Sequence, residues 1–239
     1  MEYQKMFERY EIKYLVNKKQ REAIEARMAA GGMKPDQYGR HTIRNIYFDT
    51  PSYILIRESM EKPVYKEKLR MRSYCLASEE SPVFLELKKK FQSIVYKRRI
   101  CLQEKEAMDY MLRGKQLPEE SQVGHELDYF KEFYRSLRPS MFLTYDREAH
   151  ASFEDSDLRV TFDQNILWRT RDMDLKKTVY GYELLPRGYS LMEVKTSGAI
   201  PLWMVEVLTE QQVYKTSFSK YGHAFQTLMQ MQGRRNNHV

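Results

Sequence analysis

The chain has 239 residues, of which 42% are hydrophobic and 31% are charged, and its formal net charge is +7 at pH 7. This composition suits one large or two small globular domains with enough apolar material for a core. The positive balance favours an anionic partner, such as nucleic acid, a phosphate compound or an acidic membrane surface.

Several classes of protein are excluded by what the sequence lacks. No stretch approaches the apolar length of a membrane span, and the N-terminus has no apolar signal-peptide core, so we predict a cytoplasmic protein without a transmembrane segment. Cys75 and Cys101 lie far apart without metal-ligand spacing, which argues against a disulfide framework and a zinc site. We expect both to be small buried side chains in strands.

The predicted elements indicate an α+β fold. Asn17 can cap a helix, Pro201 and Ser219 can open two more, and hairpin-like runs of strands favour an antiparallel sheet. In chain order we predict a strand at 7–14, a helix at 18–30, strands at 43–49, 65–75, 83–90 and 94–102, helices at 104–114 and 125–137, strands at 141–147, 158–164, 179–185 and 190–196, and helices at 201–212 and 220–232. About eight strands suffice to close a narrow barrel. With no repeat or linker, we predict one domain over 1–239 that closes such a barrel.

Charged residues alternate with apolar ones along most of these strands. In "YKEKLRMRSY", for example, Arg70 and Arg72 share one face with Lys68, while Leu69 and Met71 share the other. Other in-phase sets are Arg9, Glu11 and Lys13; Glu86, Lys88 and Lys90; Lys97 and Arg99; Arg159, Thr161 and Asp163; and Glu193 and Lys195, with Arg147 on a further strand. If helices cover the apolar faces, the charged faces point into the barrel.

Such a cationic lining implies a multiply charged anionic ligand. Two like charges about 7 Å apart repel by about 2–2.5 kcal/mol at an effective dielectric constant of about 20, and a bound polyanion would relieve this repulsion. Glu11, Glu86, Glu193 and Asp163 are poorly suited to bind an anion directly, but they could hold Mn²⁺ or Mg²⁺ that bridges carboxylate and phosphate oxygens. Each glutamate could instead pair with an adjacent Lys or Arg, and for Glu193 and Glu11 we favour the metal ion. For Glu86, pairing with adjacent Lys or Arg side chains is an equally good interpretation.

The order of these motifs resembles the VTC (vacuolar transporter chaperone) polyphosphate polymerase domain, a member of the triphosphate tunnel metalloenzymes. The segments that carry the resemblance are "RYEIKY", "YFDT", "KLRMRSY", "FLELKKK", "YKRR", "YDREA", "LRVTFD", "MEVKTSG" and "FSKYGHAF". The resemblance implies an antiparallel barrel that forms a charged tunnel, and transfer of the ATP γ-phosphate onto polyphosphate with Mn²⁺ or Mg²⁺.

The resemblance also implies roles for individual residues. The residues expected to line the tunnel and act on phosphates are Lys13, Arg70, Arg72, Lys88, Lys97, Arg147, Arg159 and Lys195. Further phosphate-binding residues are expected to be Arg9, Arg99, Ser219 and Lys220, the last two at a helix N-terminus, where free N–H groups favour anions. Glu193 and Glu11 are expected to hold the metal ion.

Two alternatives remain for the reaction and the partner. Triphosphatases of the wider superfamily open with Glu-x-Glu-x-Lys, whereas this chain has Arg9 in the first position, which favours the polyphosphate branch over triphosphate hydrolysis. A nucleic-acid-binding module would need exposed aromatic side chains for stacking, but most of the 18 Tyr and 11 Phe fall on apolar phases or in helices. Other VTC proteins carry a membrane segment and a regulatory domain, so those functions are expected to be absent or to lie on a partner membrane protein.

Overall fold

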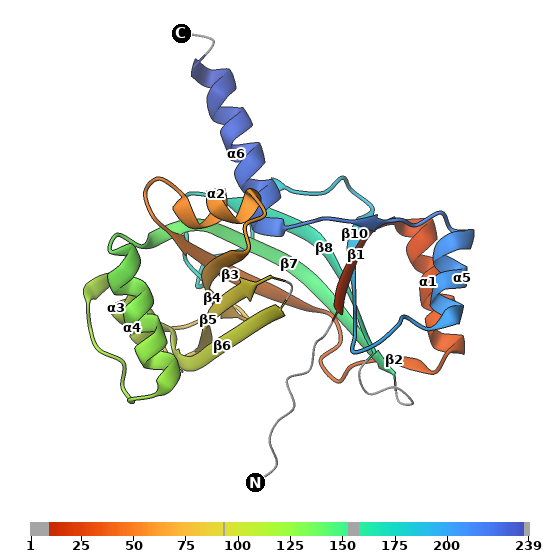
Figure 1. The fold of residues 1–239 in the computed structure, drawn as a ribbon, viewed down its shortest axis with the longest axis horizontal. Coiled ribbons are helices and arrows are strands. Elements are labelled where there is room, and N and C mark those ends of the chain that lie inside the picture. Colours follow the sequence, from red (N-terminus) through yellow and green to blue (C-terminus); the bar gives the residue numbers. More distant parts are fainter. Residues whose placement is uncertain (1–9, 93, 153–157, 237–239) are drawn as a thin grey trace. The chain divides into compact units, whose positions relative to one another are not determined.

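The computed structural model describes residues 10–92, 94–152 and 158–236 (Figure 1). Its strands are β1 (Tyr10–Asn17), β2 (Met33–Pro35), β3 (His41–Asp49), β4 (Tyr65–Ser73), β5 (Pro82–Phe91), β6 (Ile94–Gln103), β7 (Arg138–Ser152), β8 (Arg159–Arg169), β9 (Tyr182–Glu183), β10 (Tyr189–Thr196) and β11 (Lys215–Thr216). Its helices are α1 (Lys18–Ala30), α2 (Ile54–Met60), α3 (Glu104–Arg113), α4 (Gln122–Tyr134), α5 (Leu202–Glu210) and α6 (Lys220–Asn236). Within these ranges, no helix combines the length and apolar composition needed to cross a membrane.

The sheet is open, so the prediction of a closed barrel is wrong. Its strands pair in the order β11-β1-β10-β8-β7-β3-β4-β5-β6, with β2 paired to β7 and β9 paired to β8. Among the described residues β11 and β6 end this ladder without pairing to each other. The edge strand β11 has 2 residues and β6 has 10, so β11 offers too few backbone groups to close a ladder. The predicted α+β class and antiparallel pairing are confirmed.

The chain divides into two compact units. The first comprises Met1–His41, Tyr145–Ile166 and Leu185–Phe218, and the second comprises Thr42–Thr144, Leu167–Leu184 and Ser219–Val239. Strands β7 and β8 each contribute residues to both units.

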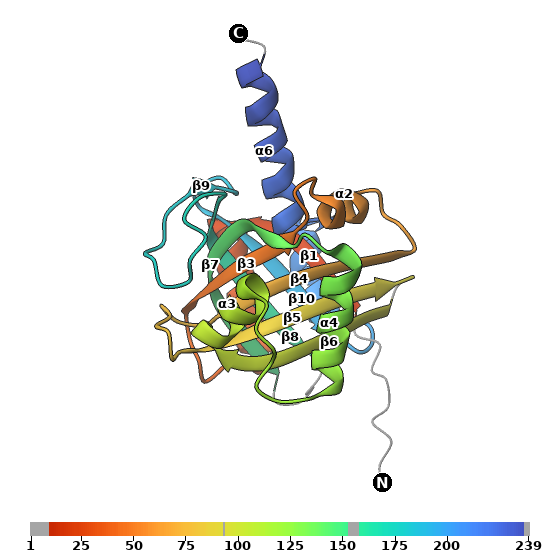
Figure 2. The ribbon, with the colours of Figure 1, turned by 90° about the vertical axis from the view of Figure 1, so that its left-hand side faces the viewer.

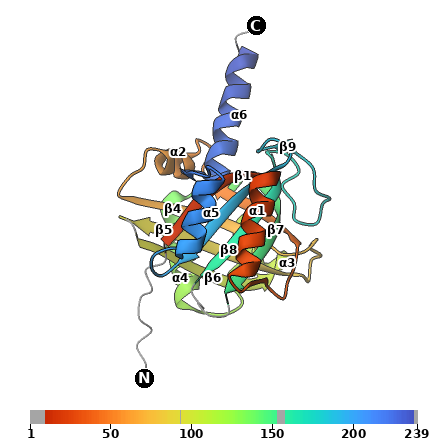
Figure 3. The ribbon, with the colours of Figure 1, turned by 90° about the vertical axis from the view of Figure 1, so that its right-hand side faces the viewer.

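In the first unit, α1 and α5 cover the apolar face of β1, β10 and β8 (Figure 3). The strand register brings Tyr14 opposite Met192 and Met192 opposite Phe162, and these side chains are buried against Ile24 of α1 and Met204 of α5. Alternation along the strands therefore leaves the charged residues on the other face of this half of the sheet.

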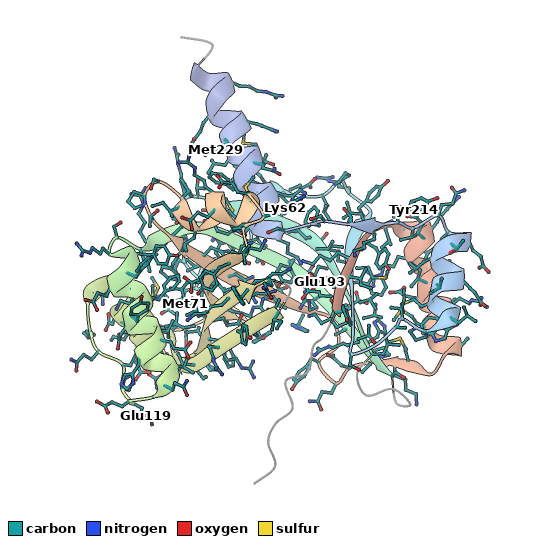
Figure 4. The ribbon with its side chains drawn as sticks, viewed as in Figure 1. Lys62, Met71, Glu119, Glu193, Tyr214 and Met229 are labelled. Carbon is teal, nitrogen blue, oxygen red and sulfur yellow. The ribbon has the colours of Figure 1, made fainter. Side chains whose placement is uncertain are left out.

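The second unit repeats this arrangement with β4, β5 and β6 covered by α3 and α4 (Figure 2). Met71, which is labelled in Figure 4, lies opposite Leu85 and is fully buried in a core that includes Tyr110 of α3 and Phe130 of α4. Helix α4 begins three residues before the predicted start, because the Ser121 side chain accepts a hydrogen bond from the Gly124 backbone N–H at 3.0 Å.

The predicted helix starts are confirmed where a capping residue was identified. The Asn17 side chain accepts a hydrogen bond from the Gln20 backbone N–H at 3.0 Å, and the Gln20 side chain accepts one from the Asn17 N–H at 3.0 Å. The Ser219 hydroxyl likewise accepts a hydrogen bond from the Gly222 N–H at 3.2 Å at the start of α6. Helix α2 and the short strands β2 and β11 were not predicted, and β9 is much shorter than the run predicted at 179–185.

The prediction that both cysteines are buried is wrong. Cys101 lies in β6 in phase with Lys97 and Arg99, so its side chain shares their exposed face. Cys75 follows the end of β4 and is also exposed. Both predictions were made from residue type alone, and residue type does not decide whether a side chain in a strand or a turn points to the core or to solvent.

The alternation predicts unequal effects for two positions of β5 that lie on opposite faces. Leu87 is fully buried beneath the helices, so Leu87→Ala should lower the free energy of unfolding by about 2–5 kcal/mol through lost burial and a cavity. Lys90 lies on the other face, opposite Lys66, so Lys90→Ala loses no core packing and relieves a like-charge contact. It should change the free energy of unfolding by less than about 0.5 kcal/mol. Urea unfolding followed by circular dichroism measures both, and equal losses would contradict the assigned faces.

Candidate functional site

The charged face of the second unit is arranged in rows across four strands. The register places Asn45, Arg72 and Phe84 in one row, Tyr47, Arg70 and Glu86 in the next, and Lys68, Lys88 and Lys97 in a third. Residues opposite one another in such rows have Cβ atoms about 4.5–5.5 Å apart. The third row therefore sets lysines opposite one another across three strands, a register that the alternation within each strand did not predict.

The carboxylate of Glu86 is the centre of what we call the arginine cluster, which comprises Arg70, Arg72, Glu86 and Lys97. Arg70 Nη2 lies 2.7 Å and Arg72 Nε 3.8 Å from Glu86 Oε2, while Lys97 Nζ lies 2.6 Å from Glu86 Oε1. The Glu86 side chain is 1% exposed. Of the two interpretations of Glu86, the structure therefore shows the pairing with basic side chains.

Two opposing effects set the pKa of Glu86. Burial acts to raise it, but the charges of Arg70, Arg72 and Lys97 outweigh burial and hold the pKa at about 2. Glu86 is therefore ionised at neutral pH, and its single negative charge lies among three cationic side chains.

The arginine side chains of this cluster are oriented by neutral partners. Arg72 Nε donates a hydrogen bond to Asn45 Oδ1 at 3.0 Å, and Asn45 Nδ2 in turn donates to the Leu143 carbonyl at 3.0 Å. Arg70 Nη1 donates to the Tyr47 hydroxyl at 3.3 Å. Because buried partners fix these guanidinium groups, little side-chain entropy is lost when an anion binds. Arg99 lies opposite Glu86 in the register, but its guanidinium group stacks over the Phe84 ring at 5.1 Å.

The start of α6 lies beside the lysine row. Lys68 Nζ donates a hydrogen bond to the Ser219 hydroxyl at 3.2 Å, so the helix N-terminus, Ser219 and Lys68 are neighbours. His223 receives a hydrogen bond at Nδ1 from the Ser219 N–H at 3.3 Å, which is a capping contact. Lys68 was seen in the sequence pattern but was not assigned to the site, since nothing in the sequence brings β4 and residue 219 together.

A buried aspartate, which sequence reasoning missed, fixes this helix. Asp49 accepts hydrogen bonds from the Leu55 and Ile56 N–H groups at 3.0 Å each and from the Tyr221 hydroxyl at 2.9 Å. The Tyr221 ring also stacks on Tyr47 with centroids 4.4 Å apart. Burial raises the pKa of Asp49, and these hydrogen bonds act against that rise. The "YFDT" segment therefore has a structural role: it caps α2 and anchors α6.

The first unit carries a second charged group of residues, the glutamate cluster, which comprises Glu11, Lys13, Arg147, Asp163, Glu193 and Lys195. Lys13 lies opposite Glu193 in the register, and Glu11 lies opposite Lys195. Lys13 Nζ is 3.1 Å from Glu11 Oε1 and 3.6 Å from Glu193 Oε1, and it donates a hydrogen bond to the Phe218 carbonyl at 3.0 Å.

Glu193 is largely buried (Figure 4) and contacts two further cations. Arg147 Nη2 lies 3.4 Å and Lys195 Nζ 3.8 Å from Glu193 Oε2. Burial lowers the pKa of Lys195, and the charges of Glu193 and Glu11 act to raise it. This carboxylate therefore lies within a ring of three basic side chains.

Arg147 is fixed by Asp163, which the sequence pattern had offered as a metal ligand. Its Nε and Nη2 atoms donate hydrogen bonds to the two oxygens of Asp163, each at 2.6 Å, in a bidentate pair. Burial acts to lower the pKa of Arg147, but Asp163 and Glu193 raise it well above its ordinary value. Asp163 is fully buried and thus acts as the anchor of Arg147.

The remaining predicted site residues differ in their surroundings. Arg159 lies opposite Lys195, but its side chain is 52% exposed and pairs with Asp36 at 3.1 Å. Arg9 lies outside the described residues. Lys88 is held in the lysine row by the register, and Lys220 is the first residue of α6.

The carboxylates of the glutamate cluster offer few ligands for a divalent cation. Across 10–92, 94–152 and 158–236, no three His, Cys, Asp or Glu side chains converge as metal ligands. The chain thus offers Glu193 and Glu11, both contacted by Lys13. Mg²⁺ is commonly held by one or two carboxylates plus substrate phosphates, so these two side chains would need phosphate oxygens to complete the coordination of such an ion.

Comparison with known proteins gives a family match and a fold match. The family model described as VTC domain matches residues 8–229. A candidate adenylate cyclase from Bacillus halodurans has a TM-score of 0.54 and 16% identity, covering 87% of this chain and 92% of that one. A candidate adenylate cyclase from Vibrio parahaemolyticus has a TM-score of 0.47 and 10% identity, covering 90% and 97%.

A third similar structure is a protein from Pyrococcus horikoshii, with a TM-score of 0.47 and 14% identity over 92% of this chain and 99% of that one. No curated protein matches the chain. At these identities, the Bacillus halodurans structure shows a shared fold.

The Glu86 ion pairs predict an acid-dependent loss of stability. Because the folded-state pKa of about 2 lies below the ordinary value of 4.5, the stabilisation is present above about pH 4.5 and is lost as the pH falls towards 2. Glu86→Gln should lower the free energy of unfolding by about 3 kcal/mol at pH 6, and this difference should shrink below pH 4.5. Denaturant unfolding at several pH values measures it.

The matched control is Glu119→Gln, because Glu119 is exposed in the loop before α4 (Figure 4). This variant should follow the wild type at every pH. A Glu86→Gln difference that stays constant between pH 6 and pH 3 would contradict the ionic origin of the stabilisation.

Proposed function

Because the chain belongs to the VTC domain family, we propose that it catalyses phosphoryl transfer on triphosphate-type substrates. The specific reaction proposed is transfer of the ATP γ-phosphate to the end of a polyphosphate chain. The observation that carries the proposal is the convergence of two arginines and a lysine on the buried Glu86 carboxylate, which holds these phosphate-binding side chain types in one fixed group. Nucleic acid is not proposed as a partner.

Phosphoryl transfer depends mainly on positioning and on neutralising the charge of the transferring group. In the second unit, the guanidinium forks of Arg70 and Arg72 would hold phosphate oxygens while Lys88 and Lys97 supply point charges. Arg99, Ser219 and Lys220 would bind further phosphates. Lys68 joins this set because it donates a hydrogen bond to the Ser219 hydroxyl.

In the first unit, Glu193 and Glu11 would hold a divalent cation. The bound Mn²⁺ or Mg²⁺ would neutralise charge on the phosphate oxygens during transfer. Arg147, fixed by Asp163, would bind phosphate without reorientation, and Lys13, Lys195 and Arg159 would supply positive charge beside it. Since three cations surround Glu193, the metal ion would bind well only together with an anionic substrate.

The product of ATP turnover tests the proposal. Purified protein incubated with ATP and Mn²⁺ should form polyphosphate and ADP, because the proposed acceptor is a phosphate chain. Gel electrophoresis of the polyphosphate and a free-phosphate assay measure the two products. Free phosphate without polyphosphate would instead assign the reaction to a triphosphatase, with water as the acceptor, and no ATP turnover with either metal would contradict the enzyme proposal.

The role of Glu193 is tested by Glu193→Gln. As a metal ligand, its loss should reduce Mn²⁺-dependent ATP turnover by at least about 100-fold while polyphosphate still binds, because the cation no longer neutralises the transferring group. Turnover across a Mn²⁺ titration and calorimetric polyphosphate binding measure the two effects.

The matched control is Glu206→Gln, which removes an exposed glutamate that pairs with Arg27 at 3.1 Å in the same unit. It should keep wild-type turnover. A Glu193→Gln variant that keeps both its rate and its metal requirement would show that Glu193 is a salt-bridge partner of Lys13, Arg147 and Lys195.

A further inference from the structure

A pocket of about 810 Å³ lies in the second unit, away from the arginine cluster. It is lined by residues of α2, the beginning of β4, β5 and α4. Tyr65 and Glu67 of β4 line it, and they alternate along the strand with Lys66 and Lys68. The pocket therefore lies on the opposite face of these strands from the lysine row.

Aromatic rings form much of the pocket wall. Tyr129 and Phe133 lie one helical turn apart on α4, and their side chains are 67% and 65% exposed. Their rings are stacked with centroids 6.2 Å apart, and Phe133 meets Tyr134 edge-on at 4.9 Å. Tyr65 adds a further ring that is 47% exposed. Contiguous exposed aromatic rings of this kind mark a binding surface.

Two carboxylates, Glu58 and Glu67, line the pocket together with one lysine, Lys89. Glu67 accepts hydrogen bonds from the hydroxyls of Tyr65 and Tyr134, and Lys89 lies 3.9 Å from its carboxylate. Among the described residues, the Glu58 carboxylate has neither a hydrogen bond nor an ion pair, and it lies on the pocket wall. Burial and the Glu67 charge raise the pKa of Tyr134, so its ring stays neutral.

We propose that this pocket binds a lysine or arginine side chain of a basic segment in a partner protein. Aromatic faces attract ammonium and guanidinium groups, and the uncompensated Glu58 carboxylate adds a charge-assisted hydrogen bond. The chain as a whole carries a net charge of +7, so the surface outside this pocket repels a basic segment. Repulsion from the remaining surface directs a basic segment to this pocket. Repulsion between two positively charged copies also disfavours a second copy of this chain as the occupant.

The test uses a fluorescein-labelled eight-residue peptide that alternates arginine and alanine, with binding to the full chain followed by fluorescence anisotropy. Tyr129→Ala and Phe133→Ala should each weaken binding by about fivefold, and Glu58→Gln should weaken it and flatten its dependence on salt. The same peptide with glutamine in place of arginine should not bind. ATP turnover of these variants should stay at the wild-type level, so failure of this proposal and failure of the proposed enzyme activity are distinguishable.

The matched controls are Tyr214→Ala, which removes a 77% exposed tyrosine from the first unit, and Glu22→Gln on the surface of α1. Both should bind the peptide as the wild type does. Equal weakening by controls and pocket variants, or equal binding of the glutamine peptide, would overturn the proposal. Spermine is a free polyamine that could compete for the same pocket. If spermine displaces the labelled peptide and binds more tightly than the peptide does, the pocket is assigned to a polyamine and the partner-protein ligand is excluded.

Discussion

The electrostatic repulsion between cations that share one face of a sheet is the constraint on which this structure depends. In the second unit, three lysines lie opposite one another in a single row, beside two arginines. Such a face is stable only if carboxylates or a bound anion offset the repulsion. Glu86 offsets part of this repulsion here. Because its carboxylate is buried, water screens its attraction to the neighbouring cations only weakly.

The two clusters use their carboxylates differently. Glu86 contacts Arg70 at 2.7 Å and Lys97 at 2.6 Å, so it is committed to basic partners. Glu193 contacts its cations at 3.4–3.8 Å, which leaves these pairs looser. Close pairs favour a fixed platform for anions, whereas looser pairs allow a carboxylate to exchange a cationic side chain for a metal ion that arrives with phosphate. This difference agrees with the separate roles proposed for the clusters.

The opposite faces of β4 and β5 carry opposite chemistry. One face presents lysines and arginines, and the other presents Tyr65 and Glu67 beside the aromatic residues of α4. Because successive side chains of a strand point to opposite faces, one pair of strands can serve an anionic substrate and a cationic partner without competition between them. Further along these strands, the residues in phase with Tyr65 and Glu67 are apolar and are buried in the hydrophobic core of the second unit.

The sequence by itself determined the alternation of charge, the capping residues Asn17 and Ser219, and the family, because these depend on neighbours within a few residues or on the order of short motifs. The tertiary structure decided the rest. That Lys68 meets Ser219, that Asp49 anchors Tyr221 and that Asp163 orients Arg147 are contacts between distant segments. Whether the sheet closes could likewise not be predicted from local sequence patterns, because closure depends on the length and pairing of edge strands such as β11.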